Sequence, residues 1–169
     1  MEKVVTHLLQ QGYKVVLCPH VKADDTLGRQ LIEKMGNPAG VSSWNWYEII
    51  RDEHNVKGLA YYKHAKIVIG MRGHAQICAA GMLTHVITLG NHRKHLDLIK
   101  KLHLPEYYVE VNDPQLAEKM IVMIDDIEIN FEIIKARYKN TLADMTEASA
   151  VFIKSIVEKD RDMQKNRLQ

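Results

Sequence analysis

Hydrophobic positions along the chain alternate between the spacing of a helix face and the spacing of a buried strand. Val4, Val5 and Leu8 recur at helical spacing, and Gly12 follows where that helix should end. A short, nearly all-apolar run rich in valine occupies residues 13–18 and predicts a strand that is buried on both faces. The chain therefore begins with a helix and a buried strand.

The same alternation continues through residue 111. Further helices are predicted at 24–35, 46–53, 56–64, 74–81 and 94–102, and further strands at 41–43, 66–70, 85–90 and 107–111. Helices that alternate with short apolar strands are typical of a parallel sheet with helices on both faces. We therefore predict an α/β domain over residues 1–112.

The remainder of the chain, residues 113–169, carries helical periodicity only. Its large apolar side chains need cover from water, at about 1.5–3 kcal/mol for each one buried. They are Ile127, Ile133, Ile134, Leu142, Phe152, Ile153 and Ile156. We predict that residues 113–167 form two long helices that pack against a second copy of the chain, as in a symmetric homodimer. The alternative is a helical hairpin that packs on its own sheet.

Composition and charge exclude several classes of protein. The chain has 169 residues, of which 46% are hydrophobic and 26% charged, and its formal net charge of +2 gives no reason to expect nucleic acid as a partner. No apolar run reaches the roughly 18 residues of a membrane span, and the N-terminus lacks a signal peptide's apolar region. Cys18 and Cys78 lie far apart within apolar runs, as small core residues would in a reducing compartment. We expect a cytoplasmic protein without a transmembrane segment.

Candidate chemistry lies in the loops that follow predicted strands, because ligands of open α/β sheets bind beyond the carboxyl ends of the strands. These loops are residues 20–25, 70–74 and 90–95. In the second, Arg72 offers donors suited to a phosphate or carboxylate, and His74 can exchange a proton near the start of a helix, where free N–H groups favour an anion. We expect both at the end of a central strand. Alternatively, Arg72 pairs with a carboxylate and His74 only caps the helix.

Residues 67–82, with the sequence IVIGMRGHAQICAAGM, resemble the signature of the polysaccharide pyruvyltransferase family. That signature is an apolar strand, then R-x-H-A, then a helix of small residues. The family's next strand usually carries Gly-x-Pro-Val-Ile and is followed by a loop with a lysine. Here Lys94 and the Val-Ile pair are present, whereas Leu83 and His85 replace the glycine and proline. Judged by the order of elements, the resemblance covers roughly residues 1–125.

The resemblance implies a Rossmann-like fold that is similar to the C-terminal half of a B-type glycosyltransferase. It also implies transfer of a pyruvyl group from phosphoenolpyruvate to a sugar of a cell-surface polysaccharide, forming a ketal. Arg72 would hold the donor's phosphate or carboxylate, and Lys94 would be a second anion contact. His74 would protonate the donor's methylene carbon or stabilise the developing charge.

The other residues that we assign to substrate binding are His20, Asp25 and Gly70. Asp24 or Asp25 would orient the acceptor sugar, although capping of the following helix is the role that favours Asp24. We expect neither a cofactor nor a metal, since His92, His95 and His103 lack a convincing further ligand.

Two other functions remain open. A glycosyltransferase half that binds a nucleotide sugar would place a diphosphate at the same helix N-terminus. A non-catalytic binding or assembly domain of the same fold is favoured by Leu83 and His85 in place of the family's usual residues. The aromatic residues Trp44, Trp46 and Tyr47 could form a stacking platform for a sugar, but packing in the core is the commoner role for such residues.

Overall fold

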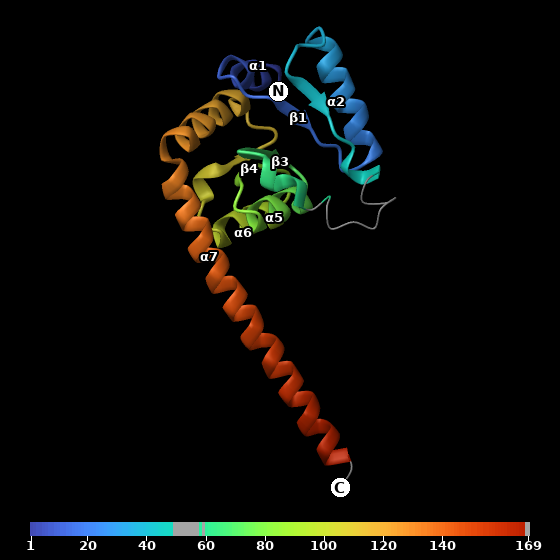
Figure 1. The fold of residues 1–169 in the computed structure, drawn as a ribbon, viewed down its shortest axis with the longest axis vertical. Coiled ribbons are helices and arrows are strands. Elements are labelled where there is room, and N and C mark those ends of the chain that lie inside the picture. The colour runs from blue at the N-terminus through green and yellow to red at the C-terminus, as the bar shows by residue number, and fades with distance from the viewer. Residues whose placement is uncertain (49–57, 59, 168–169) are drawn as a thin grey trace.

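The computed structural model describes residues 1–48, 58 and 60–167, with side chains in the last helix described up to Glu158. Its elements, in chain order, are α1 (Glu2–Gln10), β1 (Val15–Leu17), α2 (Lys22–Lys34), β2 (Val41–Ser43), η1 (Tyr61–His64), β3 (Ile67–Gly70), α5 (Gly73–Gly81), β4 (His85–Gly90), α6 (Arg93–Lys101), η2 (Pro105–Tyr107), β5 (Tyr108–Glu110) and α7 (Leu116–Arg167). Figure 1 shows that all of them except the C-terminal part of α7 gather in one body. The predicted α/β architecture with a long helical C-terminus is confirmed.

The strands form two parallel sheets. Val15 of β1 pairs with Val41 of β2, and β3, β4 and β5 form a second sheet in that order. Within the second sheet, Gly70 lies opposite Thr88 at the carboxyl end of β3. Among the described residues β3 pairs with β4 only, so our prediction of a central strand before Arg72 is wrong: β3 is an edge strand, and β4 is the central one.

The core lies around β4, with α1 and the first part of α7 packed on it. Its fully buried members include Val4, Ile87, Ile99, Ile124 and Ile127, which come from four different helices and strands. Tyr138 of α7 is also buried, and its hydroxyl accepts a hydrogen bond of 3.0 Å from the backbone N–H of Val86. These contacts fix the second sheet, and therefore the loops that follow its strands.

Strand β1 is less buried than its valine-rich sequence predicts. The side chain of Val16 is 41% exposed, while Val15 and Leu17 are half-buried. Helix α2 packs on the face of β1 that carries Leu17, where a Cβ at Gly28 would lie 3.3 Å from Leu17 Cδ1, and Val16 points to the opposite face, which is open to solvent.

The C-terminal region, predicted as two separate helices, forms the single helix α7, which has a kink. Asn130 has non-helical backbone angles (φ −107°, ψ 20°), and its side-chain amide donates to Asp126 Oδ1 at 2.7 Å. The helix does not fold back as a hairpin. After the kink it crosses the body and then projects away from it, as the orange-red ribbon in Figure 1 shows.

Two predicted helices lie partly outside the described residues. Of the helix predicted at 46–53, residues 46–48 are helical, and residues 49–57 lie outside the description. Of the helix predicted at 56–64, residues 61–64 form the 3-10 helix η1. Among the residues that the structure describes, none of the helices combines the length and the apolar composition that a membrane span requires.

Candidate functional site

Three of the predicted site residues come together at the carboxyl ends of β1 and β3. His20 follows β1, whereas Arg72 and His74 follow β3 and begin α5. The indole of Trp46 lies beside both imidazoles: its ring centre is 4.1 Å from that of His20, with the planes 15° apart, and 6.3 Å from that of His74. We call His20, Asp24, Arg72 and His74 the His–Arg cluster.

The start of α5 is built for close approach and leaves backbone donors free. A Cβ atom at Gly70 would lie 3.3 Å from the Cβ of Ala75, so any larger residue there would push the strand and the helix apart by a few tenths of an ångström. The side-chain amide of Gln76, which is fully buried, donates to the Gly70 carbonyl at 3.0 Å. Within the part of the chain that the structure describes, no side chain caps the N-terminus of α5, and its first N–H groups remain available to an anion.

Arg72 is engaged by a carboxylate from α2. Its Nη2 lies 2.6 Å from Asp24 Oδ1 and its Nε lies 3.2 Å from Asp24 Oδ2, which is the two-pronged geometry of an arginine–carboxylate pair. Arg72 itself stays exposed. The alternative role that we considered for this residue, pairing with a carboxylate, is therefore observed. The pair lies on the same edge as His20 and His74.

Asp24 has two functions in this arrangement. It occupies the third position of α2, where Oδ2 accepts hydrogen bonds from the backbone N–H groups of His20 and Val21 at 3.1 and 3.2 Å. Burial raises its pKa, but the hydrogen bonds from Arg72 and from these backbone groups outweigh burial and lower the pKa below its ordinary value. Asp24 is thus ionised and pre-positions Arg72.

Asp25 lies apart from this pair. Its carboxylate accepts a hydrogen bond of 2.9 Å from Arg29, one turn further along α2. No contact among the described residues joins it to Arg72 or His74, so its assignment to the substrate site stays a prediction. The carboxylate that the structure brings to the cluster is that of Asp24.

His20 is held as a neutral imidazole. Its Nε2 is 2.5 Å from the hydroxyl of the buried Tyr62, and that hydroxyl is also 3.7 Å from Cys18 Sγ. Burial lowers the pKa of His20 to about 4; Asp24 opposes this, whereas His74 and Arg72 lower the pKa further. Burial also raises the pKa of the Cys18 thiol to about 11, so this cysteine is a packed core residue and a poor nucleophile.

Lys94 lies at the end of the neighbouring strand, as expected, but not in the cluster. It is the second residue of α6, its side chain is exposed, and its backbone N–H donates to Nδ1 of His92 at 3.2 Å. His92 therefore caps α6, and His95 is buried beneath the helix. No contact among the described residues links Lys94 to Arg72 or His74, so its role as a second anion contact stays a prediction.

Sequence reasoning missed two residues of the site. Tyr62 lies on η1, before a predicted strand rather than in a loop that follows one, and no motif points to it. Gln76 follows R-x-H-A directly and could have been noticed as a polar residue in a helix of small ones. Trp46, for which core packing was the commoner role, is indeed buried, and its indole N–H donates to the Gly58 carbonyl at 3.1 Å.

Taken together, the cluster provides an exposed guanidinium, a helix N-terminus without a side-chain cap among the described residues, the exposed imidazole of His74 and the half-buried, neutral imidazole of His20. The first two attract an anion, and the exposed imidazole of His74 can give or take a proton next to it. The ionised Asp24 competes with any anion for Arg72. The arrangement suits an anionic substrate that reacts by proton transfer.

Comparison with known proteins gives the family of the chain. The family model for polysaccharide pyruvyl transferases matches residues 1–93, which is more than half of the 169-residue chain. The match contains the whole His–Arg cluster and ends just before Lys94, short of the residue 125 that we expected. Comparisons with curated proteins and with solved structures found no match. The extent of the family match shows that the chain belongs to the polysaccharide pyruvyl transferase family.

Proposed function

We propose that this domain binds phosphoenolpyruvate at the His–Arg cluster and transfers its pyruvyl group to a sugar of a cell-surface polysaccharide. The observation that carries the proposal is the convergence of Arg72, His74 and the uncapped N-terminus of α5 on one edge of the sheet. Phosphoenolpyruvate is a small anion with a phosphate and a carboxylate, and each of these matches the fork of an arginine or the N–H groups of a helix start.

The proposed reaction begins with a proton. His74, as an imidazolium, protonates the methylene carbon of the donor, and positive charge develops on the carbon that carries the phosphate. A sugar hydroxyl adds to that carbon and gives its proton back to the His74 imidazole. The bond between that carbon and the phosphate oxygen then breaks, and a second hydroxyl closes the ketal and gives its proton to the departing phosphate. Arg72 and the start of α5 stabilise the departing phosphate, which carries more charge as the bond breaks.

The other residues position these groups. Asp24 holds Arg72 in place before the donor arrives, and releases it when the donor's phosphate or carboxylate takes over the guanidinium. His20 is neutral, so it can share a hydrogen bond with a hydroxyl of the acceptor sugar without repelling Arg72. We propose Asp25 and Lys94 as outer contacts of the acceptor and the donor. The reducing cytoplasm is the compartment that fits the two free thiols, Cys18 and Cys78.

Calorimetry on the full chain tests the proposal. Phosphoenolpyruvate should bind, and uridine diphosphate should not; the opposite result would favour a nucleotide-sugar glycosyltransferase, and binding of neither would favour an assembly domain. Arg72→Ala should weaken the binding of phosphoenolpyruvate by about 1.5–3 kcal/mol, the scale of a charge-assisted hydrogen bond.

The matched control is Arg29→Ala. Arg29 is also exposed and also paired with an aspartate of α2, but its partner is Asp25, which lies outside the His–Arg cluster. Its replacement should leave the affinity unchanged. Equal losses in the two variants would mean that general positive charge, rather than Arg72, attracts the donor.

A further inference from the structure

The hydroxyl of Tyr62 lies behind the His–Arg cluster and has no part in the proposed reaction. Tyr62 is buried, and its oxygen lies 2.5 Å from Nε2 of His20 and 3.7 Å from Sγ of Cys18. A phenol has one proton, whereas a neutral imidazole and a thiol can each either donate or accept. The direction of these two hydrogen bonds therefore decides which ring nitrogen of His20 carries a hydrogen.

The chemistry of the three groups favours donation from Tyr62 to His20. A phenol O–H is a stronger donor than an imidazole N–H, and an imidazole nitrogen is a stronger acceptor than a phenol oxygen. In the opposite direction His20 would donate to Tyr62, and the phenol proton would be left to the thiol sulfur, which is a weak acceptor. Donation to Nε2 leaves the Tyr62 oxygen free to accept from the thiol of Cys18, so that all three groups have a partner.

Both groups keep the required protonation state at physiological pH. Burial raises the pKa of the Tyr62 hydroxyl above its ordinary value, so the phenol keeps its proton. Burial lowers the pKa of His20 to about 4, so its imidazole is neutral and carries a single hydrogen. A neutral imidazole that accepts a hydrogen bond at Nε2 carries that hydrogen on Nδ1.

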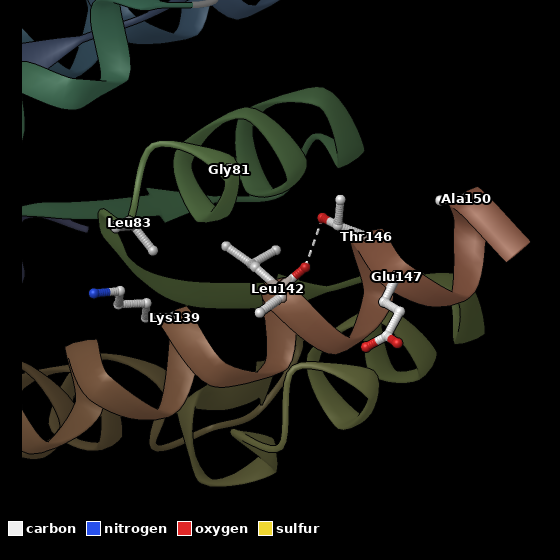
Figure 2. Close-up of a pocket in the computed structure, with 8 residues that line it drawn as sticks. Gly81, Leu83, Lys139, Leu142, Thr146, Glu147 and Ala150 are labelled. Carbon is white, nitrogen blue, oxygen red and sulfur yellow. Dashed lines mark hydrogen bonds between the residues drawn. The ribbon is translucent and has the colours of Figure 1, made fainter.

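Packing holds both side chains in place. The imidazole of His20 is stacked on Trp46, with the ring centres 4.1 Å apart, so its plane is fixed. Tyr62 belongs to the same small core cluster as Trp46, and its backbone carbonyl accepts a hydrogen bond of 2.8 Å from the hydroxyl of Thr84. The residue before Thr84, Leu83, lines a groove between this loop and α7, as Figure 2 shows. The sheet and its helices, rather than the loop that contains His20, therefore position the Tyr62 hydroxyl.

We infer that Tyr62 is a positioning residue that holds His20 as the tautomer with its hydrogen on Nδ1. Within the described part of the chain, the hydrogen bond of the His20 ring is made by Nε2, and none reaches Nδ1. His20 therefore offers an N–H donor, and not a lone pair, to an oxygen atom that binds at the His–Arg cluster.

The consequence for the reaction rests on the proposed function. There the oxygen belongs to a hydroxyl of the acceptor sugar, and the N–H of His20 orients this hydroxyl but cannot take its proton. The proton goes to the other imidazole of the cluster, that of His74. His20 thus aligns the acceptor and does not act as its base.

Nitrogen-15 NMR of the histidine rings of the full chain tests the tautomer without any substrate. In a neutral imidazole, the nitrogen that carries the hydrogen and the nitrogen that does not give widely separated signals. The spectrum of His20→Gln identifies the signals of His20 among those of the nine histidines. At pH 7 we expect the hydrogen on Nδ1 and a bare Nε2. The opposite assignment would overturn the inference.

Two matched variants test the part played by Tyr62. Tyr62→Phe removes the hydroxyl with little change in shape, and the Nδ1–H form should then lose its dominance, because a free histidine ring prefers its hydrogen on Nε2. The control is Tyr61→Phe, since Tyr61 is the neighbouring residue of η1 and its ring is stacked on Trp44. This variant should leave the signals of His20 unchanged. Unchanged signals in Tyr62→Phe, or equal changes in both variants, would contradict the role of Tyr62.

Calorimetry with phosphoenolpyruvate separates this inference from the proposed function. Because His20 contacts the acceptor and not the donor, Tyr62→Phe should bind phosphoenolpyruvate within about twofold of the original affinity, whereas Arg72→Ala should lose about tenfold or more. A loss in Tyr62→Phe as large as that in Arg72→Ala would overturn the assignment of His20 to the acceptor. If the original chain does not bind phosphoenolpyruvate, the proposed function fails, and the NMR spectrum still decides the tautomer.

Discussion

The residue whose environment departs most from expectation is His20. A histidine in a loop beyond a strand suggests an exposed, titrating group, but here it is stacked on Trp46 and bonded to Tyr62. Burial shifts its pKa from 6.5 to about 4, so the folded protein keeps it neutral through the physiological range. This makes His20 a hydrogen-bonding group of fixed charge.

The sign of the resulting pH dependence follows from linkage. Between pH 6.5 and about 4 the unfolded chain binds a proton at His20 and the folded chain does not, so the free energy of unfolding falls as the pH falls. We expect a loss of about 1–2 kcal/mol between pH 7 and pH 4.5, a value reduced for the solvent that screens a half-buried group. Urea unfolding of the original chain and of His20→Gln measures the difference, and the variant should lack this part of the loss.

The exposed His64 provides the control for this measurement. His64→Gln should keep the pH dependence of the original chain. If the free energy of unfolding depends on pH with the same slope in His20→Gln as in His64→Gln, then His20 has the same pKa in the folded and unfolded states. The assignment of a neutral, stacked imidazole would then be wrong.

At the scale of elements, the ion pair between Asp24 and Arg72 joins the start of α2 to the start of α5. It holds two helix N-termini side by side although both carry positive partial charge, and the ionised carboxylate between them offsets that repulsion. The same carboxylate occupies the guanidinium that the donor needs. The pair therefore orders the empty site and lowers its affinity for an anion.

Replacing Asp24 by asparagine separates these two effects. The amide keeps an oxygen that can accept the hydrogen bonds from the backbone of His20 and Val21, but it removes the charge that competes for Arg72. We expect Asp24→Asn to bind phosphoenolpyruvate about two- to fivefold more tightly, as measured by calorimetry at constant salt. Asp25→Asn should show no such gain. Weaker binding by Asp24→Asn would mean that orienting Arg72 matters more than freeing it.

The elements themselves were largely predictable, and the reasons are local. Short apolar runs such as residues 85–90 are typical of buried strands, and glycine or proline follows most helices at the predicted ends. The start of α2 was not predicted correctly, because Asp24 looks like a first capping residue but accepts hydrogen bonds from within the first turn. The kink at Asn130 was also missed, since helical periodicity runs through it without a break.

The site was predictable only where a motif marked it. Arg72 and His74 follow a strand and lie in a recognisable pattern, and the structure places them on one edge with His20. Tyr62 and Asp24 reach the cluster through tertiary contacts that join positions 42 and 48 residues apart, and no local pattern encodes such contacts. The edge position of β3 depends on which strands pair with one another, and the order of elements along the chain leaves that pairing undetermined.

At the scale of the whole molecule, the family match and the site lie in the body, whereas the long helix lies largely outside both. A homodimer through the helical tail, which the sequence predicts, would leave the His–Arg clusters free, because the cluster comes from the loop before α2, from α2 and from the start of α5, whereas the tail is α7. Binding of the donor and dimerisation are therefore expected to be independent. A substitution such as Ile153→Asp should not change the affinity for phosphoenolpyruvate.

The central claim is that Arg72 and the start of α5 bind the donor's anionic groups. A crystal structure of the full chain with saturating phosphoenolpyruvate tests it most directly. We predict an anionic group of the donor within hydrogen-bond distance of the Arg72 guanidinium and of the first N–H groups of α5, with His74 facing the methylene carbon. A donor bound elsewhere, with Arg72 still paired to Asp24, would contradict the account.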